Sequence, residues 1–261
     1  MEPQKKRVLL SFDIEEFDLP LEYGIPIDSE LQNSVSREGL ISILDTLESL
    51  NLRSTFFSTV VFANNNPDLI RRITAYHELA SHGWEHSHFS DDDLLRSRLE
   101  LERLFEVPVR GFRRARFGDF NREKLRSAGY TYDSSENPIF LPGRYNNLGC
   151  PRKIHEANGI LELPISSSPG IRYPLFWLSF KHTPMSFFRL MSKWSLETDG
   201  YLNIFFHPWE FSNLKKYGLP WIIRRLDGNV MLQRLNRYLL WLKSMAEFET
   251  MGSFVDQYQS R

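Results

Sequence analysis

Two histidines and a cluster of acids near the N-terminus are the side chains of this sequence best suited to chemistry. His82 and His86 stand four residues apart in the stretch SHGWEHS, and the apolar run VLLSF leads into Asp13, Glu15 and Glu16. Two imidazoles with this spacing can reach one ion from a helical turn or tight loop, because positions i and i+4 share a face. With one carboxylate, they would supply three protein ligands and leave a coordination position for water, as in a catalytic zinc site.

The spacing of the acids allows two roles at one strand end. Asp13 and Glu15 are two residues apart, so on a strand they point to the same face. One could bind the metal while the other accepts a proton from metal-bound water, whose pKa a bound ion lowers toward ~7. Glu16 would face away unless the strand has already ended. The residues alone leave open which carboxylate is the ligand.

The surrounding pattern predicts the elements that would position these side chains. Apolar runs predict strands at 7–14, 53–62, 78–83, 109–117, 160–166 and 201–206. Helical spacing and capping residues predict helices at 30–50, 67–78, 90–105, 121–129 and 230–248. Alternating strands and helices favour an α/β fold with a parallel sheet. The candidate residues, with Arg113 and His207, follow or lie on these strands, and chemistry in such folds collects at the carboxyl ends of strands.

Composition limits the other possibilities. The 261 residues, 41% of them hydrophobic, indicate one domain over 1–261, with an irregular insertion at about 136–180 rich in Pro, Gly, Asn and aromatics. The net charge of −1 offers no long-range attraction to nucleic acid. Cys150 is the single cysteine, so thiolate-rich zinc sites are excluded. No run reaches the ~18 apolar residues of a membrane span, and the N-terminus does not resemble a signal peptide, which predicts a cytoplasmic protein.

Four segments in order resemble the motifs of the NodB-homology polysaccharide deacetylases, carbohydrate esterase family 4. They are SFDIEEFD, SHGWEHS, GFRRARFG and IFFHPWEF, and GYTYDSS and LELPIS resemble the connecting motifs. The resemblance spans residues from about 7 to 211. It implies a distorted (β/α) barrel with about seven parallel strands. It also implies metal-dependent hydrolysis of an N-acetyl (or O-acetyl) group on a sugar.

Position by position, the resemblance implies a role for each motif residue. Asp13 would be the base that activates metal-bound water, and Arg113 would orient Asp13 through a bidentate contact. His82 and His86 would be ligands of a divalent metal, most favourably Zn²⁺. His207 would be the general acid that protonates the leaving group.

The sequence departs from the family pattern at three places. Ile14 replaces the second acid of the usual pair, so the carboxylate ligand moves to Glu15. A glutamate replaces the glycine that follows that pair. Ala115 replaces the proline of the third motif, and Arg116 after it brings bulk and charge to the wall of the acetyl pocket.

The expected partner is an acetylated sugar or saccharide, with Arg116, Trp177 and Trp209 as substrate-binding residues. Trp209 could stack on a sugar ring or pack in the core, and Trp177, in the insertion, could line the substrate site or cover the core. Two alternatives remain. One is a hydrolase of a linear or cyclic non-sugar amide on the same scaffold. The other is an inactive carbohydrate-binding relative, which the changes at Ile14 and Ala115 would favour.

Overall fold

The strand that carries the acidic cluster lies inside the sheet. In the computed structural model, which describes residues 6–141 and 145–260, this strand is β1 (Arg7–Ile14), and every residue after Arg7 is buried. Burial on both faces is typical of strands in parallel α/β sheets. Val8, Leu10 and Phe12 pack in the main core with the helices, whereas Leu9 faces the opposite side. Asp13 therefore points, with Leu9, toward the inner face of the curled sheet.

The sheet has nine strands and is parallel except at one edge. The order along the sheet is β10 (Tyr201–Phe206), β1, β2 (Thr55–Ser58), β3 (Glu78–Ser81), β4 (Gly111–Phe112), β5 (Tyr132–Asp133), β9 (Ile160–Glu162) and β8 (His155–Ala157), and β11 (Glu247–Phe248) pairs with β1. Among the described strands of this sheet, β8 alone is antiparallel to its neighbour, β9. The expected α/β fold with a parallel, barrel-like sheet is confirmed. A short hairpin, β6 (Phe140–Leu141) and β7 (Tyr145–Asn146), stands apart from it.

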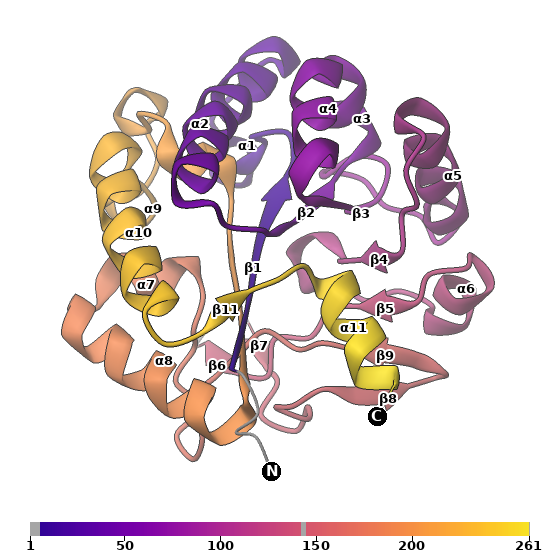
Figure 1. Ribbon diagram of the computed structural model, residues 1–261. Coiled ribbons are helices and arrows are strands. Elements are labelled where there is room, and N and C mark those ends of the chain that lie inside the picture. Colours follow the sequence, from indigo (N-terminus) through magenta and orange to yellow (C-terminus); the bar gives the residue numbers. More distant parts are fainter. Residues whose placement is uncertain (1–5, 142–144, 261) are drawn as a thin grey trace.

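Helices surround the curled sheet (Figure 1). They are α1 (Leu19–Glu22), α2 (Ser29–Leu50), α3 (Val60–Asn65), α4 (Pro67–Tyr76), α5 (Asp93–Phe105), α6 (Arg122–Ser127), α7 (Trp177–His182), α8 (Met185–Asp199), α9 (Trp221–Arg224), α10 (Gly228–Lys243) and α11 (Met251–Gln259). Three 3₁₀ turns are η1 (Ala115–Phe117), η2 (Pro208–Phe211) and η3 (Lys215–Tyr217). In the described part of the chain, none of these helices combines the length and apolarity needed to cross a bilayer.

The C-terminal helix α11 closes one end of the inner face. Its Met251 and Phe254 pack with Leu9 from β1 in a separate apolar cluster. The backbone N–H of Met251 donates to the Thr55 hydroxyl at 2.9 Å, at the start of β2. Because α11 occupies the amino ends of the strands, the open end of the sheet is the carboxyl end.

Several sequence-based boundaries are wrong, and one of them is the end of the strand expected at 160–166, which stops at Glu162. The strand expected at 53–62 ends at Ser58, because Thr59 caps α3 by accepting from the Phe62 N–H at 3.1 Å. The strand expected at 109–117 is reduced to β4, since residues 115–117 form a turn. The helix expected at 230–248 stops at Lys243, and β11 and α11 follow it. The segment 136–180 holds β6 to β9 and the start of α7, and β9 joins the main sheet.

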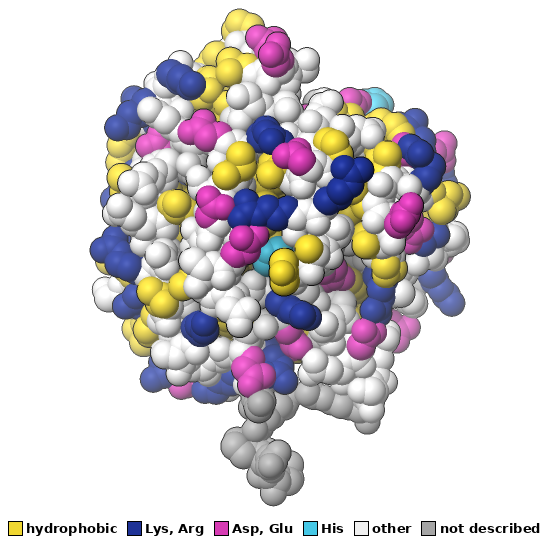
Figure 2. Space-filling view, turned by 45° about the horizontal axis from the view of Figure 1, so that its top comes forward, with side chains coloured by type: hydrophobic (Ala, Val, Ile, Leu, Met, Phe, Trp, Pro, Cys, Tyr) yellow, Lys and Arg dark blue, Asp and Glu magenta, His cyan; other side chains and the backbone are white. Residues whose placement is uncertain are grey.

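The surface mixes charges of both signs. Figure 2 shows acidic and basic side chains interspersed over the face turned toward the viewer, with no large area of one sign. This distribution agrees with the net charge of −1. Long-range attraction therefore contributes little to how a ligand approaches this face.

Candidate metal centre and active site

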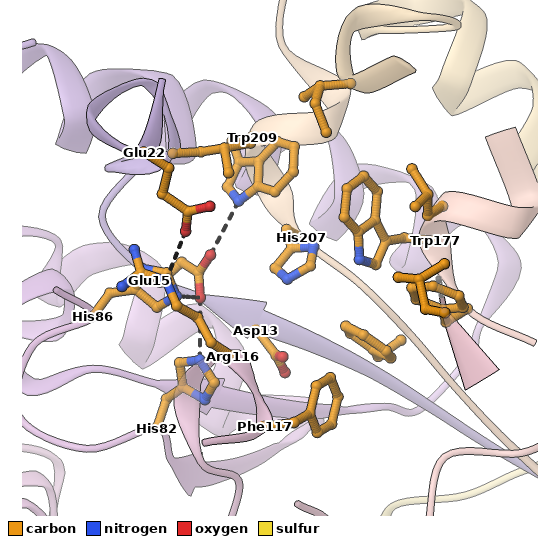
Figure 3. A pocket seen from close by; sticks show the side chains of 16 residues that line it. Asp13, Glu15, Glu22, His82, His86, Arg116, Phe117, Trp177, His207 and Trp209 are labelled. Atoms are coloured by element: carbon orange, nitrogen blue, oxygen red, sulfur yellow. Dashed lines mark hydrogen bonds and ion pairs between the residues drawn. The ribbon is translucent and has the colours of Figure 1, made fainter. Parts of the chain in front are cut away.

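The structure brings together the three predicted metal ligands. Glu15 directly follows β1, His82 directly follows β3, and His86 lies in the loop before α5. The Nε2 atoms of His82 and His86 lie 3.1 and 3.2 Å from the same carboxylate oxygen, Oε2 of Glu15. One ligand atom from each residue lies within 4.8 Å of the others, and all three side chains are buried (Figure 3).

Two observations show that this set fits a divalent cation. Both imidazoles aim the same nitrogen at one carboxylate oxygen, which brings two nitrogen donors and one oxygen donor to a common point. Trp209 donates its indole N–H to the other oxygen of Glu15 at 3.1 Å, which leaves Oε2 for the ion. Two imidazoles and one carboxylate are a donor set that zinc accepts.

The local charges keep the Glu15 carboxylate in its ionised form. Burial opposes ionisation of Glu15, but the positive field of His86, His207 and His82 outweighs it and holds the pKa of Glu15 below its usual range. The pKa of His86 shifts in the opposite direction. Burial disfavours the charged ring, but the negative charges of Glu15 and Asp18 outweigh burial and raise the pKa of His86. The site therefore favours a positive centre beside an ionised Glu15.

Asp13 is held by a fully buried arginine. Arg113 Nη1 donates to Asp13 Oδ1 at 2.6 Å and to the Ser11 hydroxyl at 2.9 Å. Its other two nitrogens donate to the carbonyl and hydroxyl of Ser134, both at 3.0 Å. The expected bidentate contact is therefore wrong, because Ser134 takes the donors that would complete it. Asp13 still lies beside its predicted partner and lines the pocket.

His207 stands across the pocket from the metal-binding set, at the end of a chain of buried charges. Its Nδ1 lies 3.1 Å from Glu210 Oε1, and its backbone N–H donates to the same oxygen at 2.8 Å. Lys181 Nζ lies 3.5 Å from the other oxygen of Glu210, and both side chains are fully buried. Burial disfavours the charged ring of His207, but Glu15, Glu210 and Asp13 outweigh it and raise its pKa.

The pocket between these groups is small and mainly apolar. The cavity measures ≈ 70 Å³, room for a few waters or a small acyl group. Its apolar lining residues are Leu19, Phe117, Leu141, Phe176, Trp177, Leu178, Phe205, Trp209 and Ile223. Arg116 and Glu22 are the charged lining residues beyond the reactive set, and they pair with each other at 2.8 Å.

The three predicted substrate-binding residues all line this pocket, but they differ in how far their side chains are exposed and already in contact with other residues. Trp209 is 3% exposed and stacks on the His207 ring at 4.8 Å, so its face is already occupied. Trp177 is half-buried and packs edge-on against both rings at 5.4 Å. Arg116 is partly exposed, and its backbone has a left-handed φ of 57°, as has that of Phe117 at 51°. Such strain in consecutive non-glycine residues is characteristic of functional loops.

Three residues at the site were not anticipated from the sequence. Asp18 and Glu22 bind Arg116, and Asp18 also contacts His86. Asp18 was visible as the fourth acid of the DIEEFD segment, three residues beyond Glu15. Lys181 gave no local signal, because its partner Glu210 lies in a distant element.

Comparison with known proteins agrees with this fold. The family model described as "Polysaccharide deacetylase" matches residues 1–132. A putative polysaccharide deacetylase from Mycobacterium smegmatis is 18% identical, with a TM-score of 0.67, over 100% of this chain and 92% of that one. The Puue allantoinase is 17% identical with a TM-score of 0.67 over the same shares.

A third similar structure is the Bc1960 peptidoglycan N-acetylglucosamine deacetylase. It is 16% identical, with a TM-score of 0.54, over 96% of this chain and 89% of that one. No curated protein matches the sequence. At these identities the structures show the fold alone, whereas the family model covers half of the chain and includes β1, β3 and β4, which carry or precede the metal-binding set and Arg113. The chain belongs to the polysaccharide deacetylase family.

Proposed function

We propose that this protein is a metal-dependent hydrolase that removes an N-acetyl (or O-acetyl) group from a saccharide. The observation that carries the proposal is the convergence of Glu15, His82 and His86 on one point, beside an arginine-held Asp13 and opposite His207. A nucleophile-activating acid, a metal-binding set and a proton donor thus surround one small cavity.

The residues of this chain would divide the reaction between them. A bound zinc ion would polarise the acyl carbonyl and lower the pKa of water. Asp13 accepts the proton of the attacking water, and Arg113 holds the Asp13 carboxylate in position through a charge-assisted hydrogen bond. His207 donates a proton to the departing nitrogen or oxygen, while Glu210 holds its Nδ1 proton and so fixes the ring orientation.

The pocket lining supports a small acyl group as the part of the substrate that enters. Phe117 and Phe205 with Trp177 make an apolar wall that suits a methyl group. The cavity is small, at ≈ 70 Å³, so we place the acyl group inside it and the sugar at the mouth, near Arg116 and Glu22.

The same apolar lining also fits a hydrolase of a non-sugar amide, because few polar groups face the substrate other than the reactive ones. Zinc-loaded protein should be tested on N-acetylated and O-acetylated saccharides and on linear and cyclic amides, with acetate release and ring opening measured separately. Acetate release from a saccharide supports the proposal. Ring opening alone supports the amide reading. Zinc binding without any turnover supports an inactive saccharide-binding protein.

A further inference from the structure

A buried carboxylate outside the metal-binding set contacts one of its two imidazoles. Asp18 Oδ1 lies 2.7 Å from Nδ1 of His86, the ring nitrogen that faces away from Glu15. Both side chains are at least nine-tenths buried. Asp18 precedes α1 at the N-cap position but makes no side-chain capping hydrogen bond. Its carboxylate is turned toward His86 instead of the helix, so the contact is not a by-product of helix capping.

This contact selects one tautomer of His86. An ionised carboxylate only accepts hydrogen bonds, so the Nδ1 of His86 carries the proton in the neutral ring. The lone pair of Nε2 then points at Glu15 Oε2, 3.2 Å away, where the cation would bind. The Nδ1 of His82 has no hydrogen-bond partner within the described residues. The two imidazoles are therefore unequal, and only His86 is locked by a neighbouring acid.

Arg116 holds Asp18 in turn. Its Nη2 lies 2.9 Å from the second oxygen of Asp18, and its Nε lies 2.8 Å from Glu22 at the pocket mouth. Both oxygens of Asp18 are thus engaged, one by the imidazole and one by the guanidinium. The backbone of Arg116 is left-handed, with a φ of 57°. A carboxylate fixed at both oxygens cannot rotate away from His86 without losing an ion pair.

We propose that Asp18 is a positioning residue that presets His86 as a metal ligand, with Arg116 as its clamp. The acids of the segment DIEEFD then divide the work, since Asp13 serves as base, Glu15 as ligand and Asp18 as the orienter of a second ligand. This inference rests on the proposed metal dependence. Carboxylates behind metal-bound imidazoles commonly change metal affinity 10–100-fold when removed.

The test is the zinc dissociation constant, measured by competition with a chromophoric chelator. Asp18→Ala should raise this constant about 10–100-fold. The matched control is Asp199→Ala, which removes a carboxylate that is also nearly buried, at 3% against 4% exposed, and also paired with an arginine, Arg152. Asp199 precedes β10, at the end of the sheet opposite the site, and its replacement should leave the zinc constant unchanged.

A second pair of measurements separates positioning from a loss of folding. Asp18→Asn keeps an oxygen that can accept a hydrogen bond from His86 but removes the charge. It should therefore lower the affinity for zinc less than Asp18→Ala does. Arg116→Met leaves Asp18 in place but removes its ion pair with Arg116, and it should measurably lower the affinity for zinc. The visible absorption of the Co²⁺-loaded protein should change in Asp18→Ala and remain as in the unaltered protein in Asp199→Ala.

The outcomes distinguish this inference from the proposed function. If the unaltered protein binds zinc and Asp18→Ala and Asp18→Asn bind it equally well, the role of Asp18 is refuted and the proposed function stands. If the unaltered protein takes up no zinc or Co²⁺, both fall together. An equal loss of zinc affinity in Asp199→Ala would also refute the role of Asp18, because the effect would then come from general destabilisation.

Discussion

Asp13 and Arg113 form a buried ion pair whose geometry suits proton transfer. The guanidinium is fully enclosed and makes hydrogen bonds with all three of its nitrogens, so it is fixed in place and holds the Asp13 carboxylate with it. Arg113 is also packed over the ring of Phe57, 4.1 Å from its centroid. A base that is already held in place pays little reorganisation cost when the reaction begins.

Asp13→Asn tests this role directly. The amide keeps the shape of the side chain but accepts a proton poorly, so kcat should fall by about 10²–10⁴-fold, the range typical of a lost general base. Zinc stoichiometry, measured on the same preparation, should not change, because Glu15, His82 and His86 remain. Full turnover in Asp13→Asn would remove Asp13 from the base role.

Glu16 gives a pH-dependent prediction for the metal-free protein. Burial, only partly offset by hydrogen bonds that include one from Thr59, raises the pKa of Glu16 from 4.5 to about 7. The folded state therefore binds this proton more tightly than the unfolded state does. Its stabilising effect is complete below pH 4.5 and is lost as the pH rises through about 7.

Glu16→Gln should remove that loss. The free energy of unfolding of the variant minus that of the unaltered protein should be about 1–3 kcal/mol larger at pH 8 than at pH 5, which means that the variant gains relative stability at the higher pH. Denaturant unfolding at both values, in the presence of a chelator, measures this difference. Glu123→Gln, at an exposed glutamate, should show no such difference between the two values. If Glu16→Gln behaves like Glu123→Gln, the pKa of Glu16 is not raised by burial as inferred.

At the scale of elements, the site depends on how α2 packs against η2. Gly39, in the middle of α2, is buried, and a Cβ built there would lie 1.8 Å from the carbonyl oxygen of Pro208. Pro208 begins η2, the turn that follows His207 and carries Trp209 and Glu210. The absence of a side chain at Gly39 therefore lets the helix approach the backbone that positions His207 and Glu210.

Gly39→Ala should be destabilising although alanine favours helices by ~1 kcal/mol. Overpacking of this kind costs about 1–3 kcal/mol, and the displaced η2 should also lower kcat by moving His207. Chemical denaturation and steady-state kinetics on the same variant measure the two effects. Gly149→Ala is the control, since nothing lies within 4 Å of a Cβ there. Equal stability of the two variants would show that α2 can shift without cost.

The sequence was most informative where one local pattern determines one position. Asp13 and Glu15 share a face because of the period of a strand, and the apolar runs of β1, β2, β3 and β10 were recognisable. The end of β2 was missed because the Thr59 cap competes with continued strand. The clamp of Asp18 by Arg116 joins residues 98 positions apart, and no local propensity encodes such a contact.

At the scale of the whole molecule, the proposed metal ligands Glu15, His82 and His86 link the end of β1 to the end of β3 across β2. Zinc that binds only the folded chain should stabilise it by about 2.7 kcal/mol when present at 100 times its dissociation constant. The midpoint of thermal unfolding should therefore rise on zinc addition and fall with a chelator. His86→Ala should abolish this shift while the protein remains folded.

His88→Ala is the matched control for that measurement. His88 is exposed and lies two residues beyond His86, outside the cluster of potential metal ligands. Its replacement should leave the zinc-dependent shift intact. An equal loss in both variants would point to surface binding of zinc and not to the buried set.

The position of β1 between β2 and β10 has a consequence for biosynthesis. β1 pairs with β2 once residue 58 is made, but its other long edge stays unpaired until β10, residues 201–206, leaves the ribosome. For most of translation, then, an apolar strand offers open backbone groups, which invite pairing with other chains. A chain released before residue 206 would keep its metal-binding set but expose this edge, so premature termination should yield aggregates and not a partly active fragment.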